Sequence, residues 1–263
     1  MLKSKFKKII SKFSISSTKH AHSIISKIPR YEPCFTTLFS HKLKIIDSAS
    51  FLAQYRGIFD KEIYKFNTTT SRPFILDCGA NIGLSIIYFK RLYPQSKIIG
   101  FEPDEKAFEA LTYNMNSFKF KNITLINKAV WTKKSLLPFF SEGADAGRIA
   151  VKCDNKKITE IQTIRLKDFL NTDVDFLKID IEGAETKILD DCSSLLFRVK
   201  HLFVEYHSFA NMPQSLDKIL KILTDASFRY YLSSSGVHSP QPFIQKNEYL
   251  GMDNQINIYA TRN

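Results

Sequence analysis

Four polar side chains suited to hydrogen bonding or proton transfer each stand at the end of a short apolar run: Asp77, Glu102, Asp180 and His207. Such runs are typical of buried parallel strands, and ligands bind in the crevice outside the carboxyl ends of these strands. A carboxylate accepts hydrogen bonds from hydroxyl groups, and a histidine exchanges a proton near neutral pH. The sequence therefore predicts one crevice that binds a hydroxylated ligand and removes a proton.

A glycine turn follows the apolar run at residues 74–76 and leads into a helical pattern. It is not a phosphate-binding P-loop, because no lysine follows Gly83, and Leu84 stands where a dinucleotide-binding turn needs its last glycine. The pattern acid-x-Gly-x-Asn-x-Gly is instead in the register of the S-adenosylmethionine (SAM) loop of class I methyltransferases. Glu102 lies 25 residues beyond the acid of this loop, where it can accept both ribose hydroxyls.

Three blocks of sequence resemble the FkbM family of SAM-dependent methyltransferases. They are Asp-Cys-Gly-Ala-Asn-Ile-Gly at 77–83, Phe-Glu-Pro at 101–103 and Leu-Lys-Ile-Asp-Ile-Glu-Gly-Ala-Glu at 177–185, in the order that the family has. The resemblance covers roughly residues 72–232 and implies methyl transfer from SAM to a hydroxyl of a sugar, glycolipid or secondary metabolite. The residues expected to bind the cofactor are Asp77, Gly79, Asn81, Gly83, Glu102 and Ala129, the last at the usual adenine position of class I methyltransferases.

Methylation of an alcohol needs a base, and Asp180 and His207 are the candidates. Lys178 lies two residues before Asp180 and therefore on the same strand face, where it can orient the carboxylate or offset its charge. Glu205 is a further candidate on the next strand. The predicted catalytic residues are thus Asp180, His207, Lys178 and Glu205.

These residues also have structural interpretations. Asp180 could cap the following helix, His207 could be a surface histidine at a strand end, and Glu185 could do no more than favour the first helical turn. Asp180, Glu182 and His207 could instead hold a divalent cation, but three scattered O and N ligands are a weak metal signature. A divalent cation is therefore not favoured, and no metal ligands are assigned.

Strand and helix patterns alternate from residue 74 onward, which predicts an α/β fold. The expected class is a doubly wound, mostly parallel, seven-stranded sheet with helices on both faces, a Rossmann-like class I methyltransferase fold. Strands are predicted at 74–76, 96–101, 123–126, 175–181, 201–207, 228–232 and 256–259, with helices at 48–66, 82–92, 104–118, 183–196 and 215–226. Residues 136–165 alternate apolar and polar, which predicts a hairpin beside the crevice.

The basic character of the 263-residue chain is concentrated at its N-terminus. Of the net charge of +12, residues 1–30 carry eight positive charges and no acid, so the remainder carries only +4. A helix over residues 2–15 would be amphipathic, which suggests peripheral contact with an inner membrane surface. The expected organisation is a basic tail at 1–30, a helical extension at 31–72 and a SAM-dependent methyltransferase domain at 73–263.

The four scattered cysteines and the absence of a long apolar run predict a cytoplasmic protein with reduced thiols. The expected partner is a small-molecule, glycan or glycolipid acceptor. One alternative is an RNA ribose 2′-O-methyltransferase, although a nucleic-acid partner is not favoured because the positive charge lies in the tail. The other is a SAM-fold binding protein without catalysis, which would tolerate loss of Asp180 and His207.

Overall fold

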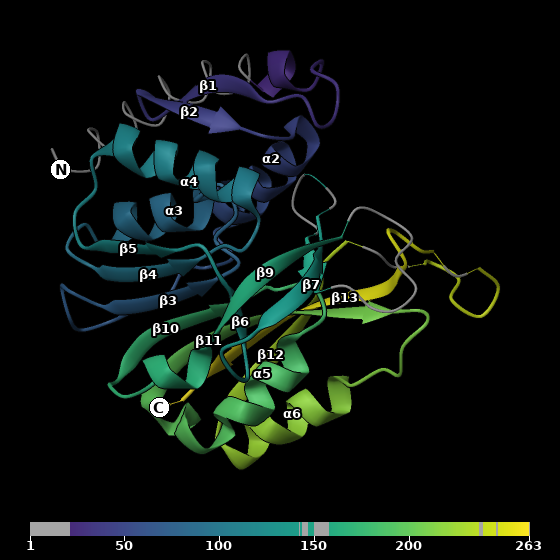
Figure 1. The fold of residues 1–263 in the computed structure, drawn as a ribbon. Helices are drawn as coiled ribbons and strands as arrows, with labels where there is room; N and C mark the ends of the chain where they lie inside the picture. The colour runs from purple at the N-terminus through teal and green to yellow at the C-terminus, as the bar shows by residue number, and fades with distance from the viewer. Residues whose placement is uncertain are drawn as a thin grey trace, which may run out of the picture.

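The computed structural model describes residues 22–141, 143, 147–149, 158–236, 239–245 and 247–262. Its largest sheet has seven strands in the order β12-β13-β11-β10-β3-β4-β5 (Figure 1). These strands are β3 (Phe74–Cys78), β4 (Lys97–Phe101), β5 (Ile123–Ile126), β10 (Val174–Ile179), β11 (Val199–Phe209), β12 (Arg229–Ser234) and β13 (Met252–Thr261). The predicted α/β class is confirmed, but the sheet is mixed, because β13 runs antiparallel to both β11 and β12.

Helices cover both faces of this sheet (Figure 1). Helices α3 (Leu84–Leu92) and α4 (Glu105–Phe118) lie on one face, and α5 (Glu185–Cys192) and α6 (Leu216–Asp225) on the other. Successive strand residues point to opposite faces, so Ile75 joins the core beneath α3 while Leu76 joins the core beneath α5. This two-sided burial explains why the central strands are continuous apolar runs.

A helical extension had been predicted over residues 31–72, but this segment is only partly helical. Strands β1 (Cys34–Leu38) and β2 (His41–Ile45) form an antiparallel hairpin that was not predicted from the sequence. Helix α2 (Ser48–Tyr55) runs into the π-helix η1 (Arg56–Asp60), so the helix predicted over 48–66 ends earlier. Asn114 of α4 holds β2, since its amide accepts from the Lys44 N–H at 2.7 Å and donates to the Lys44 carbonyl at 3.0 Å.

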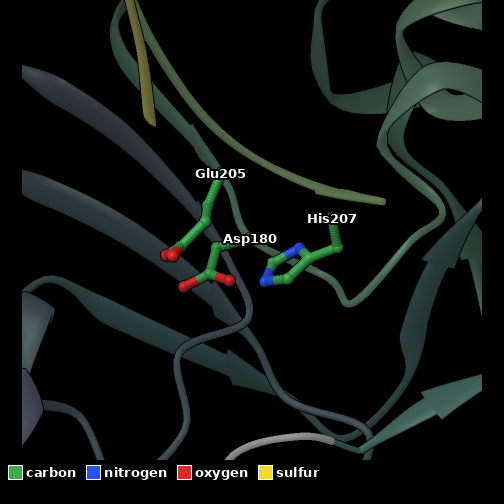
Figure 2. A group of neighbouring side chains, drawn as sticks. All are labelled: Asp180, Glu205 and His207. Atoms are coloured by element: carbon green, nitrogen blue, oxygen red, sulfur yellow. The ribbon is translucent and has the colours of Figure 1, made fainter. Parts of the chain in front are cut away.

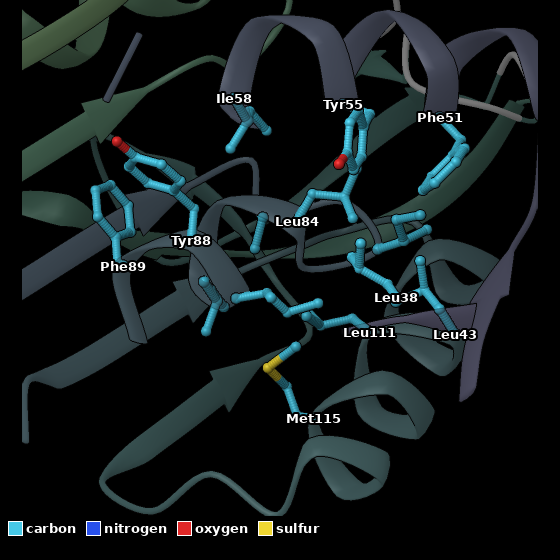
Figure 3. Packing of buried hydrophobic residues seen from close by; sticks show 14 of the residues in the cluster. Leu38, Leu43, Phe51, Tyr55, Ile58, Leu84, Tyr88, Phe89, Leu111 and Met115 are labelled. Carbon is cyan, nitrogen blue, oxygen red and sulfur yellow. The ribbon is translucent and has the colours of Figure 1, made fainter. Parts of the chain in front are cut away.

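Apolar contacts fix this extension against the helices of the sheet. Figure 3 shows Tyr55 and Ile58 facing Leu84 and Tyr88 of α3, in the same buried cluster as Leu111 of α4. The extension is thereby held as one wall beside the sheet.

A second sheet of four strands lies near the carboxyl edge of the first, in the order β6-β9-β7-β8. Its strands are β6 (Ala129–Trp131), β7 (Leu136–Phe140), β8 (Arg148–Ile149) and β9 (Ile158–Arg165). The 3-10 helix η2 (Leu166–Phe169) follows β9, and a second 3-10 helix, η3 (Ser193–Arg198), follows α5. The antiparallel β7–β9 pair confirms the hairpin predicted over 136–165, whereas β6 was not predicted.

The predicted helix over residues 2–15 and Cys153 lie outside the described residues. Cys34, Cys78 and Cys192 are free thiols. Among the helices that the structure describes, none has the length and apolar character needed to cross a membrane.

Asp47 anchors the start of α2 and the segment before it. Its Oδ2 accepts from the Ser50 N–H at 2.8 Å as the helix cap, and its Oδ1 accepts from the Tyr31 N–H at 2.8 Å. The Arg30 guanidinium lies 3.2 Å from Oδ2, and the carboxylate is buried. One side chain therefore satisfies two backbone donors and places Arg30.

Replacing Asp47 with alanine is expected to lower the free energy of unfolding by about 2–3 kcal/mol, because two backbone N–H groups lose their acceptor. Asp47→Asn keeps an acceptor oxygen for the cap and should cost less. Urea unfolding followed by circular dichroism measures both values. Equal losses in the two variants would contradict a capping role.

Candidate active site

The carboxyl ends of β3, β4, β10 and β11 open into a cleft of about 850 Å³. Residues of α2 and η1 form one wall, including Ser50, Gln54 and Gly57, and the segment 233–236 with β13 forms another. The Arg30 Nη1 donates to the Tyr249 hydroxyl at 3.0 Å, so the residue just before the extension meets the segment before β13 beside the cleft. The predicted site therefore lies at the expected edge of the sheet.

The glycine turn and Glu102 form a single hydrogen-bonded unit at one end of the cleft. Glu102 Oε2 accepts from the Asn81 N–H at 2.8 Å and Oε1 accepts from the Asp104 N–H at 2.9 Å. Burial raises the pKa of Glu102 to about 7, although these two N–H groups oppose the rise. Asn81 has a φ of +46°, in the left-handed region that asparagine tolerates.

The predicted cofactor residues do not all face the cleft. Gly79, Asn81 and Glu102 line it. Asp77 has no exposed surface; its Oδ2 accepts from the Ser85 hydroxyl at 2.5 Å, so it positions the turn from behind. Gly83 lies at the start of α3, where an added Cβ would be 2.7 Å from both Leu111 and Met115, which gives it a packing role.

Ala129 lines a narrow cavity of about 30 Å³ next to the main cleft. Gly79, Pro103 and Gly147 line both spaces, so the two are adjacent. The walls of the narrow cavity are largely apolar and include Phe101, Val130, Phe139, Ile149 and Ile181.

A buried lysine ammonium connects the ends of β3 and β10. Lys178 Nζ lies 3.3 Å from Asp77 Oδ1 and 3.2 Å from Asp180 Oδ2, and it donates to the Gly79 carbonyl at 2.8 Å. Burial lowers the pKa of Lys178, but Asp180 and Asp77 outweigh this effect and raise it well above its usual range. The predicted contact between Lys178 and Asp180 is present, and the structure adds Asp77 to it.

Asp180, Glu205 and His207 lie together on the floor of the cleft (Figure 2). One ligand-type atom from each residue lies within 4.8 Å of those of the other two. Asp180 follows β10, while Glu205 and His207 lie two residues apart on β11 and so share a face. All four predicted catalytic residues, including Lys178, line this one cleft.

Glu185 does more than favour the first helical turn, which corrects the interpretation from sequence. It is buried, and its Oε1 accepts from the Gly183 N–H at 2.9 Å and lies 3.0 Å from His207 Nδ1. Asp180 does not cap α5, because the cap residue is Ala184 and it has no side-chain cap bond.

His207 is surrounded by carboxylates rather than exposed at the surface. Burial lowers the pKa of its imidazole, but Glu182, Glu185 and Glu205 raise it well above its usual range, so the ring is charged at neutral pH. A charged imidazole cannot accept a proton, which argues against His207 as the base. Burial also raises the pKa of Glu182 to about 8 and, together with Asp180, that of Glu205 to about 7.

The three residues that could share a metal ion differ from those considered in the sequence. Asp180 and His207 are grouped with Glu205 in the structure, and not with Glu182. Glu182 has a φ of +56° and approaches His207 Nε2 at 3.5 Å.

Two buried cleft residues were not predicted. Tyr64 follows η1, and Lys178 Nζ lies 5.9 Å from the centre of its ring. Asn257 lies opposite Glu205 in the β11–β13 pair, and its Oδ1 has no hydrogen-bond partner in the structure. Neither residue belongs to a motif, and only the strand pairing could have linked Asn257 to Glu205.

The chain is similar in sequence to known methyltransferases. A family model, the methyltransferase FkbM domain, matches residues 77–230. Methyltransferase sdnD of Sordaria araneosa is 28% identical over 51% of this chain and 66% of its own length. The 2-O-methyltransferase NoeI of Sinorhizobium fredii is 22% identical over 51% of this chain and 63% of its own length. The chain thus matches just under two thirds of the length of either relative.

Among solved structures, the methyltransferase FkbM from Methylobacillus flagellatus KT is similar with a TM-score of 0.49 and 18% identity. That similarity covers 76% of this chain and 46% of the other.

Gly79→Ala is expected to destabilise the fold by about 3 kcal/mol or more. Gly79 has a φ of +89°, and an added Cβ would lie 1.9 Å from the Asp180 carbonyl oxygen. Gly57→Ala is the matched control in the same cleft, because its nearest neighbour would be Ile63 at an ordinary 3.4 Å. Thermal unfolding of both variants measures the difference, and similar midpoints would contradict the close approach of Gly79 to Asp180.

Proposed function

The chain belongs to the FkbM family of methyltransferases, and on that premise we propose that it transfers a methyl group from SAM to a hydroxyl oxygen of a sugar, glycolipid or secondary metabolite. One observation carries the proposal. The glycine turn with Glu102 and the cluster of Asp180, Glu205 and His207 open into the same cleft. A cofactor and an acceptor bound there would lie side by side, as group transfer requires.

The residues at the glycine turn fit SAM, which when bound supplies a methyl group on a positively charged sulfur. Glu102 at the end of β4 would hold the ribose hydroxyls. The apolar cavity beside Ala129 would receive one face of the adenine ring. The surplus of carboxylates around Asp180 and Glu205 is complementary to a cationic cofactor.

The two walls of the cleft fit an acceptor that carries several hydroxyl groups. They are rich in neutral hydrogen-bonding side chains: Gln54, Ser233, Ser234, Ser235, Gln255 and Asn257. Such groups both donate to and accept from hydroxyls. The relative from Sinorhizobium fredii is named a 2-O-methyltransferase, which supports oxygen as the methylated atom. The cleft acids oppose RNA as the acceptor, because carboxylates repel phosphate.

The removal of the acceptor proton is assigned to the carboxylates of the cluster. Lys178 fixes Oδ2 of Asp180, which sets the direction of its other oxygen, Oδ1. Glu205, with a pKa of about 7, is matched to proton exchange near neutral pH. The charged His207 supports both carboxylates and does not itself receive the proton.

SAM binding should strengthen about tenfold between pH 6 and pH 8. Glu102 has a pKa of about 7, and only its ionised form accepts from both ribose hydroxyls. Its ionised fraction therefore rises from about one tenth to about nine tenths over this range. Calorimetry of the wild type and of Glu102→Gln measures this dependence, which the variant should largely lose. A well-folded wild type that does not bind SAM would sink the proposed function.

Asp180→Asn should keep SAM binding and slow methyl transfer by at least about a hundredfold, because the amide cannot accept the hydroxyl proton. The measurement is transfer of a labelled methyl group to a panel of glycans, glycolipids and hydroxylated metabolites. Normal turnover by the variant would show that Asp180 does not accept the proton, and Glu205 would remain as the candidate base.

A further inference from the structure

We propose that Asp180, Glu205 and His207 form a binding site for one divalent metal ion on the floor of the cleft. One ligand-type atom of each residue lies within 4.8 Å of the other two. Atoms that share a divalent ion at 2.1–2.6 Å lie at most about 4–5 Å apart, so a small contraction of the cluster would close the site. Figure 2 shows the imidazole of His207 and the carboxylate of Glu205 on either side of the Asp180 carboxylate.

The imidazole of His207 is already oriented as a metal ligand would be. Its Nδ1 is hydrogen-bonded to the buried Glu185 Oε1 at 3.0 Å, which keeps an N–H on Nδ1. The other nitrogen, Nε2, lies 3.5 Å from Glu182 Oε1 and on the ring edge that points toward Asp180 in Figure 2. An ion bound at Nε2 would displace the proton that the charged ring carries there. Metal-bound histidines almost always donate their second ring N–H to such an acceptor, which fixes both tautomer and ring orientation.

A buried amide oxygen beside the cluster is an independent sign of a ligand. Asn257 lies directly opposite Glu205 in the β11–β13 pair, so the two side chains share a face of the sheet. Asn257 is only 7% exposed and lines the cleft, and its Oδ1 has no hydrogen-bond partner in the structure. A buried oxygen left in this state is costly, and a bound ion or its water ligand would satisfy it.

The neighbouring contacts leave each carboxylate an oxygen for the ion. Lys178 contacts Asp180 through Oδ2, and the Ser235 hydroxyl donates to Glu205 through Oε1. The contacts of Lys178 and Ser235 therefore leave Asp180 Oδ1 and Glu205 Oε2 available to the ion. Two carboxylates, one imidazole and an amide oxygen form an oxygen-rich set, which suits Mn²⁺ or Mg²⁺ better than a thiophilic metal.

The role of the ion rests on the proposed function. Placed between Asp180 and Glu205, it would hold the acceptor hydroxyl and lower the pKa of its proton, which would still pass to a carboxylate of the cluster as in the proposed function. Metal binding itself needs neither SAM nor acceptor, so the two proposals can be tested separately.

Titration of the full chain with Mn²⁺ alone, followed by electron paramagnetic resonance of the unbound ion, tests the site. The wild type should bind one Mn²⁺ per chain. Glu205→Gln should weaken binding at least about tenfold, and Glu185→Gln, which acts only through His207, by about 10–100-fold. Glu248→Gln is the matched control, because Glu248 is an exposed acid that lines the same cleft outside the cluster.

Each outcome decides the proposal. A folded wild type without Mn²⁺ binding overturns the metal site, and so does a loss in Glu248→Gln as large as in Glu205→Gln, since binding would then reflect overall charge. The metal site is also overturned if both single variants, Glu185→Gln and Glu205→Gln, bind Mn²⁺ as tightly as the wild type. SAM calorimetry on the same samples separates these failures. A protein that binds SAM but not Mn²⁺ lacks only the metal site. A protein that binds Mn²⁺ but not SAM contradicts only the proposed function.

Discussion

The site depends on the contacts that the ammonium group of Lys178 makes with its neighbours. This group contacts carboxylates at the ends of two adjacent strands, Asp77 on β3 and Asp180 after β10, and it also holds the Gly79 carbonyl of the turn between them. Lys178 and Asp77 are buried, whereas Asp180 is partly exposed to the cleft, so neither of the two buried groups could stay charged without its partners. The strand ends, the glycine turn and the Asp180 carboxylate are therefore one unit, and a change in any part moves the rest.

The floor of the cleft carries more carboxylates than it has cations to balance them. Lys178 and His207 face Asp77, Asp180, Glu182, Glu185 and Glu205. Burial raises the pKa values of Glu182 and Glu205, and the neighbouring carboxylates raise them further. A buried surplus of one charge is unfavourable for folding, and proteins retain it where function needs it. An incoming cation, whether a sulfonium or a metal ion, would relieve the imbalance, so the same charges that weaken the empty fold favour ligand binding.

The parts of the fold that local sequence determines were predictable. Strands β3, β4, β5, β10 and β11 are apolar runs because both of their faces are covered, and the contact between Lys178 and Asp180 follows from the two-residue repeat of a strand. The β1–β2 hairpin was missed because Asn114, 70 residues away, holds it. The contact of Glu185 with His207 and the position of Asn257 beside Glu205 depend likewise on packing and strand pairing between distant segments. No local pattern carries that information.

Strand β13 follows β12 in the chain but lies between β11 and β12 in the sheet. During synthesis on the ribosome, β12 thus emerges before the only strand that it pairs with among the described residues, and β11 keeps an open edge for the same interval. Asn257 on β13 completes the cleft floor. The nascent protein therefore completes its cleft only when β13 inserts, and until then the exposed edge of β11 is a target for chaperones or for mispairing with another chain.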